Sequence, residues 1–224
     1  MLDVRMVTVG PVRENCFFVR LAGAGTAVVV DPGEEAERLL QAKDALGIET
    51  VAAILITHTH FDHIGAVKAL HDATGAPVYC PELEREVLAN INDYVPAGWG
   101  LGPFESYEAD HTVTGDDVLE LAGMTFDVRF TPGHSPGHVT YSVRGEDALL
   151  SGDVLFQDSV GRVDLPGGDW PTLLASIQSL VKEFPAQTIV YPGHMGITTL
   201  GTELAHNPFL RDLEGLPSRL SHPS

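Results

Sequence analysis

The sequence has few basic residues, and this scarcity argues against several classes of partner. Lysine and arginine number 13 against 31 aspartate and glutamate residues, and the formal net charge is -18. Phosphate backbones repel such a surface, so we expect no nucleic-acid partner. No stretch approaches the roughly 20 apolar residues of a membrane span, so we expect no membrane partner either.

Cysteine is also scarce, with only Cys16 and Cys80. Two thiols this far apart make neither a disulfide scaffold nor a cysteine-rich zinc site, so we expect two buried apolar thiols. The first 15 residues contain acidic side chains and no long apolar run, which argues against a signal peptide and predicts a cytoplasmic protein. The length and the 44% hydrophobic content suit a single domain over residues 1–224.

Short β-rich runs alternate with helical runs, which predicts a mixed α/β architecture. Strands are expected over 17–21, 27–30, 51–56, 78–80, 118–121, 125–130, 139–143, 148–150 and 188–191. Helices are expected between 36 and 46, over 64–75, over 81–91 and over 170–184. The stretch from Asn92 to Phe104 is rich in Gly, Pro and aromatic residues, which is typical of a lid, a pocket wall or a plain surface connection.

Metal-type side chains directly follow four of the predicted strands. "VAAILIT" leads to His58 and His60, "TFDVRFTPG" to His134, "ALLSG" to Asp153, and "TIVYPG" to His194. Ligand sites assemble at strand ends of α/β sheets, because the sheet holds the following loops close together. We therefore expect these four segments to meet at one site.

The segment "THTHFDH" predicts two adjacent metal sites. Residues two apart in an extended segment point the same way, so His58 and His60 can reach one ion together. Asp62 and His63 follow as the chain turns into a helix, and they point towards a second ion nearby. Side chains from later in the sequence can complete the two metal sites. His134 can complete the first site and His194 the second, and the two carboxylate oxygens of Asp153 can bridge both ions.

The ligand types indicate the chemistry. A lone histidine is more commonly a hydrogen-bonded core residue, but this combination favours a metal centre. Imidazole and carboxylate without thiolate suit zinc, iron or manganese. We expect two divalent ions, and we expect zinc in preference to iron or manganese. Two ions about 3.5 Å apart can share a hydroxide and polarise a carbonyl oxygen, which predicts a hydrolase.

Five motifs resemble the metallo-β-lactamase superfamily: "VVVDPG", "THTHFDH", "TPGHSPGH", "LLSGDVLF" and "VYPGH". The resemblance implies an αββα sandwich, in which two mixed sheets face each other with helices outside. It also implies the metal ligands: His58, His60 and His134 for the first ion, Asp62, His63 and His194 for the second, and Asp153 bridging them. Aspartate at the bridging position marks the glyoxalase-like branch of the superfamily rather than the cysteine-bearing β-lactamases.

Two further positions near the predicted ligands have supporting roles. Asp31 in "VVVDPG" matches a family position that supports the metal loop. His138 in "HSPGH" lacks the context of a ligand, and we expect it to steady the loop that carries His134.

The motifs "GRVDLPGGDW" and "TTLGTELAHNPFL" resemble the short glyoxalase II group, the hydroxyacylglutathione hydrolases. Longer members of that family place a lysine and a tyrosine in the loop that here reads "GRVD". Arg162 can replace the lysine as an anion contact for substrate, or it can simply pair with Asp164. Asp164 cannot replace the tyrosine, and "MGI" after His194 replaces the usual "GP".

The resemblance implies a thioesterase that acts on small-molecule thioesters such as S-lactoylglutathione. A hydroxide between the two metals would attack the thioester carbon, and Asp62 would orient it or accept its proton. Two alternatives stay open: a persulfide dioxygenase with one iron, and a lactonase or phosphodiesterase that uses the same metal pair.

Overall fold

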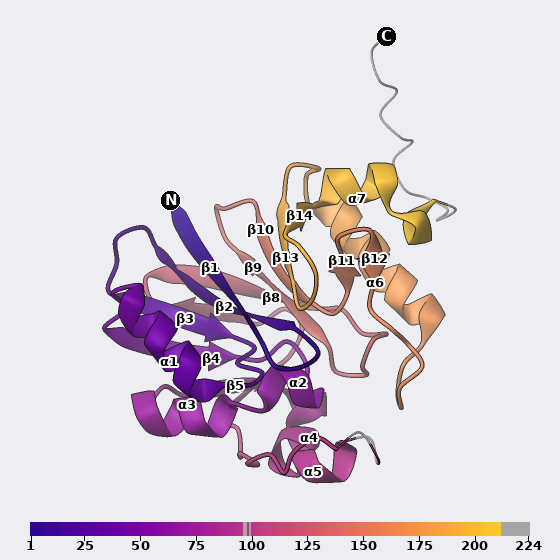
Figure 1. The fold of residues 1–224 in the computed structure, drawn as a ribbon. Helices are drawn as coiled ribbons and strands as arrows, with labels where there is room; N and C mark the ends of the chain where they lie inside the picture. Colours follow the sequence, from indigo (N-terminus) through magenta and orange to yellow (C-terminus); the bar gives the residue numbers. More distant parts are fainter. Residues whose placement is uncertain (96–97, 99, 212–224) are drawn as a thin grey trace.

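The computed structural model describes residues 1–95, 98 and 100–211, and its strands form two six-stranded sheets (Figure 1). The first sheet has the order β1–β2–β3–β4–β5–β6. Its strands are β1 (Leu2–Val9), β2 (Glu14–Leu21), β3 (Thr26–Val30), β4 (Thr50–Leu55), β5 (Val78–Pro81) and β6 (His111–Val113). Strands β3 to β6 run parallel to one another, whereas β1 and β2 pair antiparallel.

The second sheet has the order β14–β13–β10–β9–β8–β7. Its strands are β7 (Val118–Leu121), β8 (Met124–Phe130), β9 (Val139–Val143), β10 (Ala148–Gly152), β13 (Ile189–Pro192) and β14 (Thr198–Thr199). The pairings give β8, β10 and β13 one direction, so their carboxyl ends share an edge of the sheet. A small hairpin, β11 (Leu155–Phe156) with β12 (Ser159–Val160), follows β10.

Helices cover the outer face of each sheet, as Figure 1 shows. The first half of the chain contains α1 (Ala36–Ala45), α2 (Phe61–Ile64), α3 (Val67–Thr74), the 3₁₀ turn η1 (Glu82–Glu84), α4 (Arg85–Ala89) and α5 (Ile91–Tyr94). The second half contains α6 (Trp170–Glu183), α7 (Leu200–His206) and the 3₁₀ turn η2 (Pro208–Leu210). No helix within the described ranges has the length and apolar content needed to cross a membrane.

Alternating residues of the central strands build the core on both faces of each sheet. In β3, Val28 and Val30 face the second sheet and pack with Phe126 and Tyr141, whereas Val29 joins the cluster under the outer helices. This alternation follows from the two-residue period of a strand. Because both faces are covered, the strands read as continuous apolar runs, which is typical of doubly covered sheets. The predicted αββα sandwich is confirmed.

Local sequence explains where the helices begin and end. Asp169 caps α6 by accepting a hydrogen bond from the backbone N–H of Thr172 at 2.9 Å. Gly75, with a φ of 68°, ends α3. The helix predicted over 64–75 is interrupted, because Gly65 packs closely on the backbone of Gly33, and α3 begins only at Val67.

Several elements escaped the sequence analysis, mainly at sheet edges. Strand β1 at the edge of the first sheet is largely half-buried or exposed and lacks a continuous apolar run. Strands β6 and β14 have three and two residues, and only their pairing partners define them.

The predicted loop from Asn92 to Phe104 begins inside α5, and its residues 96, 97 and 99 lie outside the described part of the chain. Residues 212–224 also lie outside it.

One close approach in the fold gives a test of how tightly the strand-end loops are held. Gly133 has a φ of 128°, and a Cβ there would overlap the backbone of Leu173 in α6. Gly145 also has a positive φ, 80°, but a Cβ there would meet open space. We expect Gly145→Ala to cost about 1 kcal/mol of unfolding free energy, from backbone strain alone. Gly133→Ala should cost about 3 kcal/mol or more, because packed backbone must shift as well.

Urea unfolding of the two variants, with matched metal loading, measures the difference. Equal costs at the two positions would contradict the close packing of the Gly133 loop on α6.

Candidate metal centre

Five metal-type side chains meet where the carboxyl ends of four strands converge, and Asp62 and His63 on α2 complete the set of seven. His58 and His60 follow β4, and Asp62 and His63 lie in α2 directly after them. The other three follow strands of the second sheet: His134 after β8, Asp153 after β10 and His194 after β13. All seven residues predicted as ligands are thus brought together, although they come from both sheets.

The first group consists of His58, His60 and His134. His60 Nδ1 lies 2.8 Å from His134 Nε2, which lies 3.2 Å from His58 Nε2. One nitrogen of each ring lies within 4.8 Å of the other two. His58 and His134 are buried and His60 is half-buried, so the group opens on one side only.

The second group consists of Asp62, His63 and His194. Asp62 Oδ2 lies 3.2 Å from His194 Nε2 and 3.8 Å from His63 Nε2. Asp153 lies between the two groups. Its Oδ2 is 3.4 Å from His134 Nε2 and 3.5 Å from His194 Nε2, and its Oδ1 is 3.4 Å from His63 Nε2.

These separations fit divalent cations. Ligand atoms about 2 Å from a tetrahedral zinc lie about 3.3 Å from one another, close to the spacings of both groups. Within the described residues, His63 Nε2 and Asp153 Oδ1 are buried and have no hydrogen-bond partner. Buried polar atoms without a partner are costly, and a cation between them would satisfy both.

His58 and His60 are held in the protonation state that binds metals. Burial, reinforced by neighbouring rings, lowers the pKa of His58 well below its ordinary value. Burial and then His134 lower the pKa of His60 to about 4. Both imidazoles are therefore neutral at pH 7, and a neutral ring offers the lone pair that a metal requires.

The second group attracts positive charge. Burial raises the pKa of Asp153, but His63, His194 and His134 more than offset it, so the net pKa is lowered and the carboxylate is ionised. Conversely, burial lowers the pKa of His63 and His194, but neighbouring carboxylates, Asp153 first, raise it above the ordinary value. A divalent ion would supply the same positive charge in concentrated form.

The ring nitrogens that face away from the cluster are held by the protein. His134 Nδ1 donates to the backbone carbonyl of Arg162 at 2.7 Å, which leaves Nε2 as the lone-pair nitrogen. His63 Nδ1 lies 3.1 Å from Asp31 Oδ2. Such outer contacts fix the orientation and tautomer of a metal-binding ring.

Asp31 makes hydrogen bonds to the segment that leads to His58. Its Oδ1 accepts the backbone N–H of Thr57 at 2.7 Å, and its Oδ2 accepts the Thr57 hydroxyl at 2.6 Å. Its backbone adopts a φ of 49°, which is unusual for a residue other than glycine. Asp31 also lies near His58 and His63, but these hydrogen bonds already occupy its oxygens.

His138 is buried and stacks on the His58 ring, with 4.9 Å between the ring centroids, but both of its nitrogens have partners outside the two groups. Its Nε2 accepts the backbone N–H of Asp153 at 3.0 Å, and its Nδ1 pairs with the Thr131 hydroxyl at 3.1 Å. Burial lowers its pKa, so it is neutral and can accept that bond. The expected supporting role is therefore directed at Asp153.

Glu84 is a buried residue that sequence reasoning missed. Its Oε2 accepts the backbone N–H and the hydroxyl of Thr59, at 3.0 and 2.6 Å. Its Oε1 accepts the Ser135 hydroxyl at 2.5 Å and the Gly137 N–H at 2.8 Å. One carboxylate thus joins the loop that carries His58 and His60 to the loop that carries His134.

Asn15 and Glu14 were missed as well. The Asn15 side chain donates to the carbonyls of Pro192 and Met195, both at 3.0 Å, and so anchors the loop around His194. Glu14 is buried beside His63, 3.9 Å away, and burial raises its pKa. Neither lies in a motif with metal-ligand spacing, so no local pattern marked them as functional.

A hollow of about 170 Å³ opens onto the cluster. Its polar wall is formed by five of the cluster residues and Arg162, and its apolar wall by Val12, Phe61 and Leu165. Arg162 is one of the lining residues, and its guanidinium pairs with Asp164, which is one of the two roles considered for it.

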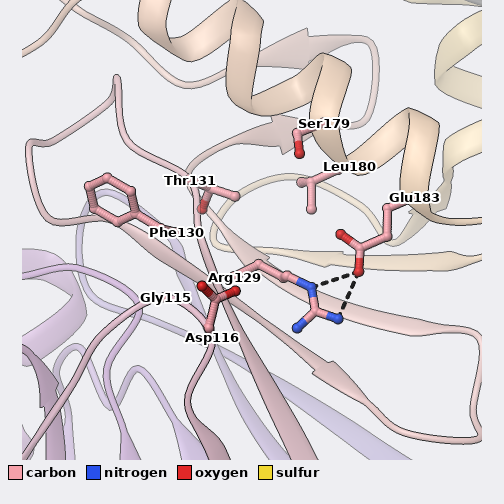
Figure 2. A pocket seen from close by; sticks show the side chains of 8 residues that line it. All are labelled: Gly115, Asp116, Arg129, Phe130, Thr131, Ser179, Leu180 and Glu183. Carbon is pink, nitrogen blue, oxygen red and sulfur yellow. Dashed lines mark hydrogen bonds and ion pairs between the residues drawn. The ribbon is translucent and has the colours of Figure 1, made fainter.

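A larger hollow of about 420 Å³ lies elsewhere, between α6 and the end of β8 (Figure 2). It holds an ion pair between Arg129 and Glu183, with both guanidinium contacts at 2.7 Å. Figure 2 shows no histidine among its lining residues. Side-chain chemistry, and not volume, therefore identifies the candidate site.

Comparison with known proteins agrees with this geometry. Residues 9–194 match the model of the Metallo-beta-lactamase superfamily. The chain is 39% identical over 211 residues to the probable metallo-hydrolase YqgX of Bacillus subtilis, covering 92% of this chain and 96% of the relative. It is 31% identical over 210 residues to the hydroxyacylglutathione hydrolase GloC of Haemophilus influenzae, covering 93% and 98%.

Two solved structures are also similar. The BLEG-1 B3 metallo-beta-lactamase has a TM-score of 0.86 and 42% identity, covering 93% of this chain and all of the other. TTHA1623 in a di-iron-bound form has a TM-score of 0.81 and 40% identity, covering 92% of this chain and all of the other.

The contacts of Glu84 predict that it supports the cluster without touching it. Glu84→Ala would leave buried donors on both loops without an acceptor, at a cost of about 3 kcal/mol in unfolding free energy. Metal affinity should fall by about 10- to 100-fold, as for other residues that orient ligands. Glu82→Ala, at an exposed position of the same turn, is the matched control.

Competition with a chromophoric chelator measures the affinity, and urea unfolding measures the stability. Glu84→Ala protein that binds metal as tightly as the Glu82→Ala control would contradict this role.

Proposed function

Because the chain belongs to the metallo-beta-lactamase superfamily, we propose that it uses a metal-dependent hydrolase centre to cleave small hydroxyacyl thioesters of the S-lactoylglutathione type. The observation that carries the proposal is the position of Asp153, whose two oxygens lie within 3.5 Å of nitrogens from both groups. The identity to GloC, a hydroxyacylglutathione hydrolase, supports the thioester class.

In this proposal the two groups hold two ions. His58, His60 and His134 would hold the first, Asp62, His63 and His194 the second, and Asp153 both. When bound, such a pair supplies a hydroxide at neutral pH and polarises the substrate carbonyl. Zinc suits this ligand set, and the di-iron form of TTHA1623 makes iron the main alternative.

Asp62 is the proposed proton acceptor. Burial raises the pKa of Asp62, but the combined effect of His63 and His194 is larger and lowers the pKa below its ordinary value. The carboxylate is therefore ionised at neutral pH. Its Oδ2 lies 3.2 Å from His194 Nε2 and lines the hollow, where it can orient an attacking water. It would accept the water proton as oxygen bonds to the thioester carbon.

The reaction then ends by cleavage of the C–S bond. The electron pair leaves with sulfur, and the carboxylic acid product retains the oxygen from water. Thiols ionise near pH 8.5, so the thiolate can leave without a strong general acid. The apolar wall of Val12, Phe61 and Leu165 would exclude bulk water from the acyl group.

A second candidate is β-lactam hydrolysis, favoured by the 42% identity to the BLEG-1 B3 metallo-beta-lactamase. Lactones and phosphodiesters would suit the same ion pair. A persulfide dioxygenase with one iron is less well supported, because the continuation "LPGGDW" after "GRVD" favours the thioesterase.

An activity panel on zinc-loaded and iron-loaded protein tests the proposal. The panel contains S-lactoylglutathione, S-lactoyl-N-acetylcysteamine, a lactone, a phosphodiester, a β-lactam, and glutathione persulfide with oxygen uptake as its readout. We expect a thioester to give the highest kcat/KM, and chelation to abolish turnover. Metal-replete protein that hydrolyses no thioester would refute the proposal, and oxygen uptake with one iron per chain would establish the dioxygenase instead.

Replacement of the bridging carboxylate tests the two-ion arrangement separately. Asp153→Ala should lower turnover by more than about 100-fold, because an aspartate that faces both groups affects both ions. The bound metal should fall below two ions per chain. Asp72→Ala, which removes an exposed carboxylate paired with Lys68 on α3, is the matched control.

Metal analysis and kinetics on the same preparations give both readouts. If Asp153→Ala and Asp72→Ala have equal rates and equal metal content, Asp153 does not bridge.

A further inference from the structure

The charge of Arg162 is cancelled before any substrate arrives. Arg162 Nε donates to Asp164 Oδ1 at 2.6 Å, and Arg162 Nη2 donates to Asp164 Oδ2 at 2.8 Å. This fork uses one complete edge of the guanidinium. The hydrogen bonds from Arg162 lower the pKa of Asp164 to about 2, so the carboxylate is ionised and the pair carries no net charge at neutral pH.

The pair does not stabilise the fold to any large extent. The two side chains are 50% and 67% exposed, and exposed ion pairs contribute little to stability. The backbone of Arg162, in contrast, is fixed by its bond to His134 Nδ1. The segment is therefore held beside the cluster by its backbone, and Asp164 determines the net charge of the Arg162 side chain that faces the hollow.

No other lysine or arginine lines the hollow in the described part of the chain. The remaining wall away from the cluster is apolar: Val12, Phe61 and Leu165. Arg13 follows Val12 in sequence and is exposed, but it is not among the lining residues. With a net charge of -18, the protein as a whole also repels anions.

A thiol group with carboxylates would thus meet an apolar wall and a neutralised arginine. Such a thiol would meet an arginine whose charge Asp164 balances and whose Nε–Nη2 edge Asp164 occupies, whereas an uncharged thiol would lose nothing. We propose that Asp164 is a specificity-determining residue, and that the thiol released from the physiological substrate carries no net negative charge. This inference rests on the proposed thioesterase activity and narrows its substrate class.

Four lactoyl thioesters with one common acyl group test the inference on the zinc-loaded full chain. The thiols are thiocholine (positive), N-acetylcysteamine (neutral), 3-mercaptopropionate (negative) and glutathione (net negative). We expect kcat/KM to be lowest for the two anionic thiols, by about 3- to 10-fold, through KM more than kcat. Added salt should reduce the difference, because it screens exposed charges.

Asp164→Asn keeps the size of the side chain and releases the charge of Arg162. The ratio of kcat/KM for the glutathione ester to that for the N-acetylcysteamine ester should rise by about 3- to 10-fold. Asp44→Asn is the control: it removes another exposed carboxylate from an ion pair, with Lys43 on α1, and should leave the ratio unchanged. Calorimetric titration with S-methylglutathione, which has no scissile bond, should show the same gain in affinity.

The inference is overturned if wild-type protein prefers the anionic thiols, or if Asp164→Asn gives the same ratio as Asp44→Asn. A loss of glutathione-ester activity on Arg13→Gln would also overturn it, because Arg13 would then be the anion contact. Absence of turnover for all four esters in metal-replete protein would instead refute the thioesterase itself, and the inference with it.

Discussion

The structure depends on the burial of imidazoles and carboxylates in one cluster at the edge of two sheets. His58, His63, His134 and Asp153 are at most 5% exposed, and their ligand atoms lie within a few ångströms of one another. Taking such groups out of water costs several kcal/mol for each charge. The arrangement is stable only where the protein orients each group and positive charge balances the carboxylates.

The protein meets this constraint with polar contacts that join loops from distant parts of the chain. Asp31 holds Thr57 and His63, and Glu84 joins the His60 loop to the His134 loop. Asn15 anchors the loop around His194. Each contact connects two segments rather than two neighbours, so the geometry of the cluster belongs to the whole sandwich and not to any single motif.

The sequence predicted what local patterns encode. Continuous apolar runs marked the central strands, but only the structure shows that Val28 and Val29 face different core clusters. The seven metal-type residues were predictable because each directly follows a strand or lies within one short motif. Glu84 and Asn15 were not, because their partners lie 25 and 177 residues away and no local spacing records such a contact. The pairing of Arg162 with Asp164 was foreseen as one of two outcomes, but only the structure places Arg162 in the wall of the hollow beside the cluster.

The central claim is that seven side chains hold two ions side by side. Anomalous diffraction at the zinc edge, from crystals of zinc-loaded protein, tests it most directly. The account predicts two peaks: one about 2.1 Å from nitrogens of His58, His60 and His134, the other contacting Asp62, His63 and His194, with Asp153 reaching both. A single peak, or two peaks away from these residues, would contradict it.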